Sequence, residues 1–229
     1  MSAGDQSNQA PDLEFSRKYT AEHARRYFEK HQRGFWRRLS NTREQAIARA
    51  ALKCAGNPQS VLDLPCGTGR FWETLAQDPD RKIYAADLSE DMVETGLSLR
   101  SRTLAGRIEA FTCSAFEIPK PDSSVECVFS MRLLHHIGDE AHRVAILKEF
   151  ARVAANSVIV SLWVDGNLKA WRRSYRERNR SAHQYQNRFL LPAVQFKQEC
   201  LSAGLVIRDR LNLIPGYSMW AVYVLEKRT

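Results

Sequence analysis

Glycines and aspartates in the first half of the chain are placed to bind a nucleotide-like ligand. Gly67 and Gly69 follow the short apolar run 61–64, and Asp87 ends a second run, twenty residues after Gly67. A glycine loop after a strand lets a ligand approach the backbone closely, because glycine has no side chain in the way. A carboxylate at the end of the next strand can accept hydrogen bonds from two ribose hydroxyls. The spacing therefore predicts a site for a ribose-containing ligand.

The residues around this loop argue against the two common diphosphate-binding motifs. The dinucleotide motif G-x-G-x-x-G needs a third glycine where Trp72 stands, and an indole there would disturb the helix–strand packing that the glycine allows. A Walker-type phosphate loop is excluded as well, because no Gly-Lys-Ser or Gly-Lys-Thr follows. The pattern thus indicates a nucleoside that carries no pyrophosphate.

Alternating strand and helix patterns surround the loop and predict an α/β domain. From residue 60 onward, apolar runs alternate with helical stretches, which predicts a mostly parallel sheet with helices on both faces. Pro215 and Gly216 form a tight turn before the last strand, so that strand must be antiparallel to its predecessor. Helices are predicted over 17–55 with a break near Gly34, and over 69–77, 90–102, 139–153 and 192–203. Strands are predicted over 60–64, 82–87, 107–113, 125–131, 157–164, 205–213 and 217–225.

Four segments of this region resemble motifs of the class I (Rossmann-like) S-adenosylmethionine-dependent methyltransferases. They are 61–69 with the glycine loop, 86–92 with Asp87, 113–119, and 125–136 with its Leu-His-His ending. The resemblance covers residues 60 to about 164. It implies a three-layer Rossmann-like fold with a seven-stranded, mostly parallel sheet and an antiparallel C-terminal strand. It also implies an enzyme that takes a methyl group from S-adenosylmethionine.

The resemblance assigns a cofactor site residue by residue. It places Asp63 to hold the loop and the amino group of the cofactor, and Asp87 to bind the ribose. Ser114 stands where many relatives carry an aspartate that accepts from the adenine amino group, and a hydroxyl does this less strongly. Core packing explains Met92 and Met131 equally well. The residues expected to bind S-adenosylmethionine are Asp63, Pro65, Gly67, Gly69, Asp87, Leu88, Met92, Ser114, Ala115, Phe116 and Met131, and no metal ligand is expected.

His135 and His136 are the candidates for a catalytic role. A histidine after the fourth strand would lie near the acceptor, where it could take a proton from an oxygen or nitrogen nucleophile. The same pair packs at the start of a helix in some relatives, so both interpretations stay open. Arg132 is likewise a candidate for contact with the acceptor. An obvious acid–base pair is not required, because alignment of an activated sulfonium with the acceptor supplies much of the rate.

The positive charge of the chain is concentrated in two segments. Residues 17–49 hold ten basic and three acidic side chains, and residues 169–188 hold seven basic and one acidic, against a net charge of +8 for the whole chain. Arginine binds carboxylates and phosphates, so the segments favour an anionic small molecule, glycan or lipid-type acceptor. Solvated helix faces are the alternative explanation. The expected acceptor contacts are Tyr19, Tyr27, Arg132, Trp171, Arg172, Arg173, Tyr175 and Arg176.

The same segments define the expected domain organisation. Residues 1–15 are expected to be a flexible tail and 16–229 a single methyltransferase domain, in which 16–56 form an N-terminal helical lid and 165–191 a basic inserted lid. Five cysteines without a C-x-x-C pair favour the reducing cytoplasm. No apolar run reaches the roughly 18 residues of a membrane span, although peripheral membrane contact stays open. The oligomeric state is not indicated.

Two other functions are compatible with the sequence. Clustered arginine and aromatic residues also occur on RNA-binding surfaces, so an RNA methyltransferase is the second candidate. It ranks below a small acceptor because the sequence shows no appended RNA-binding module. A methyltransferase-like protein that only binds or regulates ranks third. The intact glycine loop and Asp87 argue against it, because a scaffold needs neither.

Overall fold

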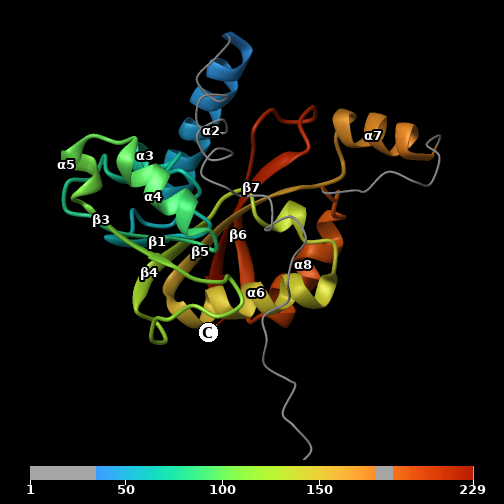
Figure 1. Ribbon diagram of the computed structural model, residues 1–229. Coiled ribbons are helices and arrows are strands. Elements are labelled where there is room, and N and C mark those ends of the chain that lie inside the picture. The colour runs from blue at the N-terminus through green and yellow to red at the C-terminus, as the bar shows by residue number, and fades with distance from the viewer. Residues whose placement is uncertain (1–34, 179–187, 229) are drawn as a thin grey trace, which may run out of the picture.

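The computed structural model describes residues 35–178 and 188–228, which form a seven-stranded sheet flanked by helices (Figure 1). The strands are β1 (Ser60–Asp63), β2 (Lys82–Asp87), β3 (Ile108–Thr112), β4 (Val125–Ser130), β5 (Ala154–Trp163), β6 (Leu205–Asn212) and β7 (Trp220–Lys227). Their order across the sheet is β3-β2-β1-β4-β5-β7-β6. Strands β1 to β5 pair in parallel, and β7 is antiparallel to both β5 and β6. The predicted sheet is confirmed.

The predicted helices are present in the expected order with shorter bounds, whereas the helices at 134–136 and 168–178 were not predicted. The helices are α2 (Phe35–Cys54), α3 (Trp72–Leu75), α4 (Glu90–Ser98), α5 (Arg102–Ala105), the short 3-10 helix η2 (Leu134–His136), α6 (Glu140–Val153), α7 (Leu168–Arg178) and α8 (Ala193–Ser202). The helix predicted over 90–102 is divided, because the side chain of Ser101 caps a new helix by accepting from the Leu104 N–H. Ser89 and Asp139 cap α4 and α6 in the same way.

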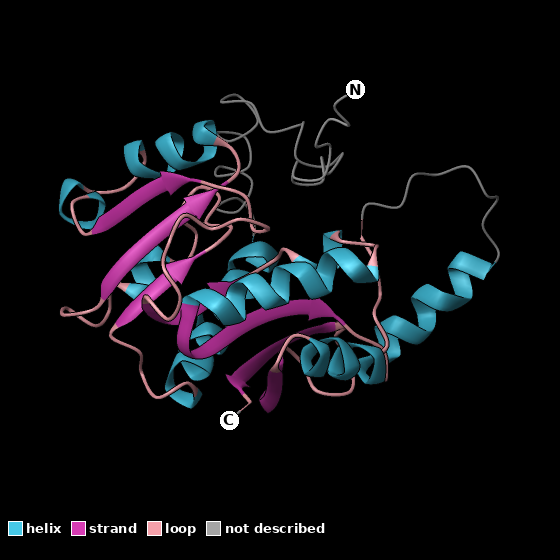
Figure 2. Cartoon of the chain, turned by 90° about the horizontal axis from the view of Figure 1, so that it is seen from below, coloured by secondary structure: helices cyan, strands magenta, loops and turns pink. Residues whose placement is uncertain are grey.

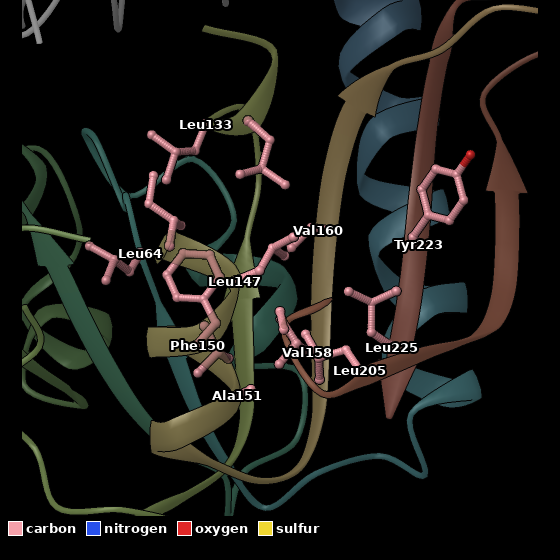
Figure 3. Close-up of a cluster of buried hydrophobic side chains, with 14 of the residues drawn as sticks. Leu64, Leu133, Leu147, Phe150, Ala151, Val158, Val160, Leu205, Tyr223 and Leu225 are labelled. Carbon is pink, nitrogen blue, oxygen red and sulfur yellow. The ribbon is translucent and has the colours of Figure 1, made fainter. Parts of the chain in front are cut away.

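Helices cover both faces of the sheet, so the domain has three layers (Figure 2). Neighbouring residues of a buried strand point to opposite faces, which is why β4 places Val128 in one apolar cluster and Phe129 in the other. In the first cluster, Leu147 and Phe150 of α6 lie near Val158 and Val160 of β5 (Figure 3). The second cluster joins the opposite face to α2, α3 and part of α4.

Helix α2 packs on the sheet along one buried stripe. Its buried residues Glu44, Ile47, Ala48, Ala51 and Leu52 recur every three to four positions, as expected for one helix face. This part of the segment predicted as a lid therefore belongs to the core layer. The lid role of 16–56 stays a prediction, and residues 16–34 lie outside the described part of the chain.

None of the helices in the described ranges is both long enough and apolar enough to span a membrane.

Candidate cofactor and acceptor site

The loop after β1 is shaped by two glycines and one buried tryptophan. Gly67 and Gly69 both have a positive φ, of 52° and 70°, which only glycine adopts without strain. A Cβ on Gly69 would lie 2.3 Å from the ring of Trp72, and one on Gly96 would lie 3.0 Å from the same ring. The fully buried indole thus fills the space between the loop and α4, where glycines make room for it. The part played by Gly96 was missed, although a glycine inside a helix was the available signal.

Side chains from α2 and from the segment after α4 hold the loop in place. Arg100 donates to the carbonyls of Thr68 and Gly69, at 3.3 and 2.7 Å. Arg70 pairs with Glu44 at 3.0 Å, and Gln45 donates to the Arg70 carbonyl at 3.0 Å. None of these supports is predictable from local sequence patterns, because the bonded residues lie 25 to 32 positions apart in the chain.

Asp63, at the end of β1, is a buried carboxylate. Neither oxygen accepts a well-formed hydrogen bond from the described residues, although the Trp72 side chain lies near enough to lower its pKa slightly against the effect of burial. Burial, and next the negative charge of Asp87, raise the pKa of Asp63 well above its usual range. A buried charge without a partner is costly, so a cationic ligand group beside it would stabilise the ionised form. The amino group of S-adenosylmethionine fits this requirement.

Asp87, at the end of β2, ties the glycine loop to the start of α4. One carboxylate oxygen accepts from the Gly67 N–H at 2.9 Å, and the other accepts from the Ser89 N–H at 3.0 Å. Burial raises the pKa of Asp87, and these backbone donors oppose that shift. Each oxygen keeps a second lone pair, so the carboxylate can still accept from ribose hydroxyls. Leu88 follows it and is 53% exposed.

The other predicted cofactor residues follow β1, β2, β3 and β4 and so lie at the carboxyl ends of parallel strands. Pro65 is half-buried, whereas Met92 and Met131 are buried. The Ser114 hydroxyl accepts from the Phe116 N–H at 3.2 Å, which gives it a structural role in its own turn. Ala115 and Phe116 are half-buried and pack against the core. The cofactor role of each residue stays a prediction.

His135 lies in an aromatic enclosure at the ends of β4, β5 and β7. Its ring stacks on Trp163 at 5.3 Å, meets Trp220 edge-on at 5.1 Å, and lies 4.1 Å from the half-buried His136. Burial, and next the positive charges of His136, Arg132 and Arg188, lower the pKa of His135 well below its usual value. The neutral imidazole is therefore a weak proton acceptor. Catalysis by His135 or His136 stays a prediction.

Guanidinium groups surround this enclosure. Arg132 lies 5.2 Å from the Trp220 ring centroid, while Arg173 and Arg188 lie 5.0 and 5.5 Å from that of Trp163. The backbone of Arg132 has a φ of 71°, and its N–H donates to the Ser161 hydroxyl at 2.8 Å. The sequence shows no sign of the roles of Trp163, Trp220 and Arg188. The two tryptophans have the pattern of ordinary strand residues, and Arg188 belongs to a segment with many basic residues.

The remaining predicted acceptor residues do not join this cluster. Trp171, Arg172, Tyr175 and Arg176 are exposed on α7. Arg173, on the same helix, is half-buried and reaches Trp163. Tyr19 and Tyr27 lie outside the described residues. The acceptor role of all of them stays a prediction.

Within residues 35–178 and 188–228, no three histidine, cysteine, aspartate or glutamate side chains gather so that they could hold a metal ion.

Part of the chain is similar to known methyltransferases. Residues 61–157 match the model of a family described as a methyltransferase domain, and the matched range runs from β1 into β5. A magnesium protoporphyrin IX methyltransferase from Synechocystis PCC 6803, solved with bound SAH, superposes with a TM-score of 0.75 over 95% of this chain and 100% of that one. At 16% identity, that likeness shows the fold.

Curated relatives match over the same region. A probable tocopherol O-methyltransferase of the rice chloroplast (Oryza sativa subsp. japonica) is 31% identical over 55% of this chain and 35% of its own length. A tRNA (carboxymethyluridine(34)-5-O)-methyltransferase of Xenopus tropicalis is 28% identical over 45% of this chain and 15% of its own. The chain therefore spans only a minor part of the length of these two relatives.

The family match, the sheet order and the glycine loop together define the class. Residues 61–157 match a methyltransferase domain, and the sheet that holds them has the class I, Rossmann-like strand order. S-adenosylmethionine is the cofactor of this family.

Proposed function

We propose that this chain is an S-adenosylmethionine-dependent methyltransferase that acts on an anionic small molecule or on a glycan or lipid-type acceptor. The observation that carries the proposal is the buried, unpartnered carboxylate of Asp63 at the base of the glycine loop. A domain that only bound a partner protein would gain nothing from burying this acid, whereas a cationic cofactor group beside it would stabilise its ionised form.

The donor side would be held mainly by fixed groups. Asp63 would bind the amino group of the cofactor, and Asp87 its ribose hydroxyls, next to the backbone of Gly67. Leu88 and the segment 114–116 would flank the adenine. When bound, S-adenosylmethionine supplies a methyl group already activated by the sulfonium, so the task of the protein is to align donor and acceptor.

The acceptor side would be defined by cations and aromatic rings. Arg132, Arg173 and Arg188 supply positive charge around Trp163 and Trp220. Guanidinium groups next to flat rings suit a carboxylate or phosphate on an apolar or ring-shaped body. The enclosed His135 would orient this body by contact, because its lowered pKa keeps it neutral.

RNA is the second candidate acceptor. It is supported by the Xenopus tropicalis relative, whose name states a tRNA substrate, and by the arginine and aromatic side chains exposed on α7. A non-catalytic binding protein is the third. For the compartment we propose the cytoplasm, since all five cysteines are free thiols.

Calorimetric titration with S-adenosylmethionine tests the first step. Binding at micromolar cofactor is expected, and no binding at millimolar cofactor would rule the enzyme out. Cell extract incubated with the protein and methyl-labelled cofactor then tests the acceptor. Label in the small-molecule or lipid fraction supports the proposal, and label in RNA favours the second candidate. Cofactor binding with no labelled product would favour a non-catalytic role.

A further inference from the structure

Helix α7 has two faces that differ in what they contact. Toward the body, Ala170 is buried, and Arg173 donates to the Arg188 carbonyl at 2.9 Å. Away from it, Leu168, Trp171 and Tyr175 are 46%, 66% and 61% exposed. These three stand at positions i, i+3 and i+7, so they form one continuous stripe along the helix. We call Leu168, Trp171 and Tyr175 the outer stripe.

The helix is fastened to the body at its first turn. The N–H groups of Leu168 and Lys169 donate to the carbonyls of Gly216 and Tyr217, at 3.0 and 3.1 Å. The Asn167 side chain caps the helix by accepting from the Ala170 N–H at 2.9 Å. Beyond this turn α7 projects away from the sheet, whereas α6 and α8 lie against it (Figures 1 and 2). The outer stripe is thus held in a fixed position and presented outward.

Basic side chains flank the outer stripe. Lys169, Arg172 and Arg176 are exposed, and Lys169 also lies 4.9 Å from the ring centroid of Tyr217, which is 39% exposed. An exposed apolar stripe with a tryptophan and a tyrosine, bordered by lysine and arginine, is the pattern of helices that lie in the interface of a membrane. The cations would lie at the level of anionic headgroups, which attract them.

We propose that the outer stripe and its basic flanks dock α7 on an anionic lipid surface. Lipid is favoured over RNA because Trp171 and Tyr175 stack on each other, with centroids 6.3 Å apart and an interplanar angle of 23°, which leaves fewer ring faces for bases. Leu168 extends the stripe with an aliphatic side chain, which suits acyl chains. Docking would bring the surface close to Arg173 on the inner face of the same helix. The proposal stands on these contacts and does not depend on methyltransferase activity.

Vesicle co-sedimentation of the full chain tests this surface. Binding is expected to vesicles of phosphatidylcholine mixed with phosphatidylglycerol, weaker at high salt, and not to phosphatidylcholine alone. The double variant Trp171→Ala, Tyr175→Ala should reduce the partition coefficient at least about tenfold, and Arg172→Gln, Arg176→Gln should reduce it comparably. The matched controls are Val194→Ala, Leu201→Ala for exposed apolar residues and Lys148→Gln, Lys197→Gln for exposed cations, and neither should change binding.

Three results would overturn the proposal. One is an unmodified chain that binds neither kind of vesicle. Another is binding that the α7 variants leave intact. The third is a chain that ignores vesicles but binds a single-stranded RNA oligonucleotide through the same α7 residues. Calorimetry with S-adenosylmethionine on the same variants separates this proposal from the proposed function. Vesicle binding can be lost while cofactor binding persists, and cofactor binding can be absent while vesicle binding persists.

Discussion

The two halves of the candidate site are built from opposite charges and by different means. Around the ends of β1 and β2, buried carboxylates and backbone N–H groups face a glycine loop. Around the ends of β4 and β5, arginines from distant segments meet two tryptophans. In our proposal, the first half binds the cationic cofactor. The second binds an anionic acceptor.

The difference lies in what fixes each half. Asp63 and Asp87 end strands in the middle of a parallel sheet, so the sheet itself fixes their positions. The acceptor half depends on long side chains that span sequence distances such as that from Arg132 to Trp220. Such a site can change its specificity without disturbing the sheet.

The largest effect is expected from Asp87→Ala. This change removes the acceptor of the Gly67 and Ser89 N–H groups, together with the proposed ribose contact. Affinity for S-adenosylmethionine should fall at least about 100-fold, because hydrogen bonds to a charged group contribute about 1.5–3 kcal/mol each. Calorimetry measures it, with the exposed Asp91→Asn as the control. An unchanged affinity would show that Asp87 is structural.

Asp63→Asn should raise the folding stability of the ligand-free chain and lower its affinity for the cofactor. In the ligand-free chain the raised pKa means that folding favours the protonated acid, so this group costs stability as the pH rises through its folded pKa. The variant should therefore melt at a higher temperature than the unmodified chain, by a larger margin at pH 8 than at pH 5. Its affinity for the cationic cofactor should fall more than about tenfold.

The pH dependence of that affinity sharpens the test. In the unmodified chain, cofactor binding should release a proton from Asp63, so affinity should decline as the pH falls through its raised pKa. The amide that Asp63→Asn introduces cannot ionise, so this decline should disappear in the variant. Equal pH profiles of calorimetric affinity in the two proteins would remove Asp63 from the cofactor site.

Substitutions in the acceptor half should impair use of the acceptor rather than binding of the cofactor. The double variant Arg132→Gln, Arg173→Gln should lower kcat/KM for the acceptor about fivefold to thirtyfold, since each partly exposed guanidinium contributes about 0.5–1 kcal/mol. Cofactor affinity should change little. Arg102→Gln, exposed on α5, is the control. If cofactor affinity falls as much as turnover, the division into two halves is wrong.

The same division explains which parts the sequence predicted. The loop, Asp63 and Asp87 belong to local patterns, so a strand, two glycines and a spacing of twenty residues were enough to indicate them. Trp163 and Trp220 looked like ordinary strand residues, and their meeting depends on β7 pairing antiparallel beside β5, with Trp163 opposite Trp220. The direction in which α7 faces could not be read from composition, because it is set by hydrogen bonds from Leu168 and Lys169 to the turn before β7.

Glu44 joins the two halves and provides the smallest but most discriminating prediction. One oxygen of this buried carboxylate lies 3.0 Å from both Arg70, beside the glycine loop, and Arg132, beside Trp220. Glu44→Gln keeps the shape of the side chain and removes its charge, so the ion pairs that position Arg70 and Arg132 become weaker. A two- to threefold loss, about 0.5 kcal/mol, is expected in cofactor affinity and in acceptor kcat/KM together.

The control for this variant is Glu94→Gln, an exposed acid on α4. If only one of the two measurements changes in Glu44→Gln, the halves are independent and α2 serves merely as a core helix. If both change, the neutral residue has loosened donor and acceptor at once. Helix α2 then transmits the position of the glycine loop to the acceptor side, because a single carboxylate fixes the guanidinium groups of both.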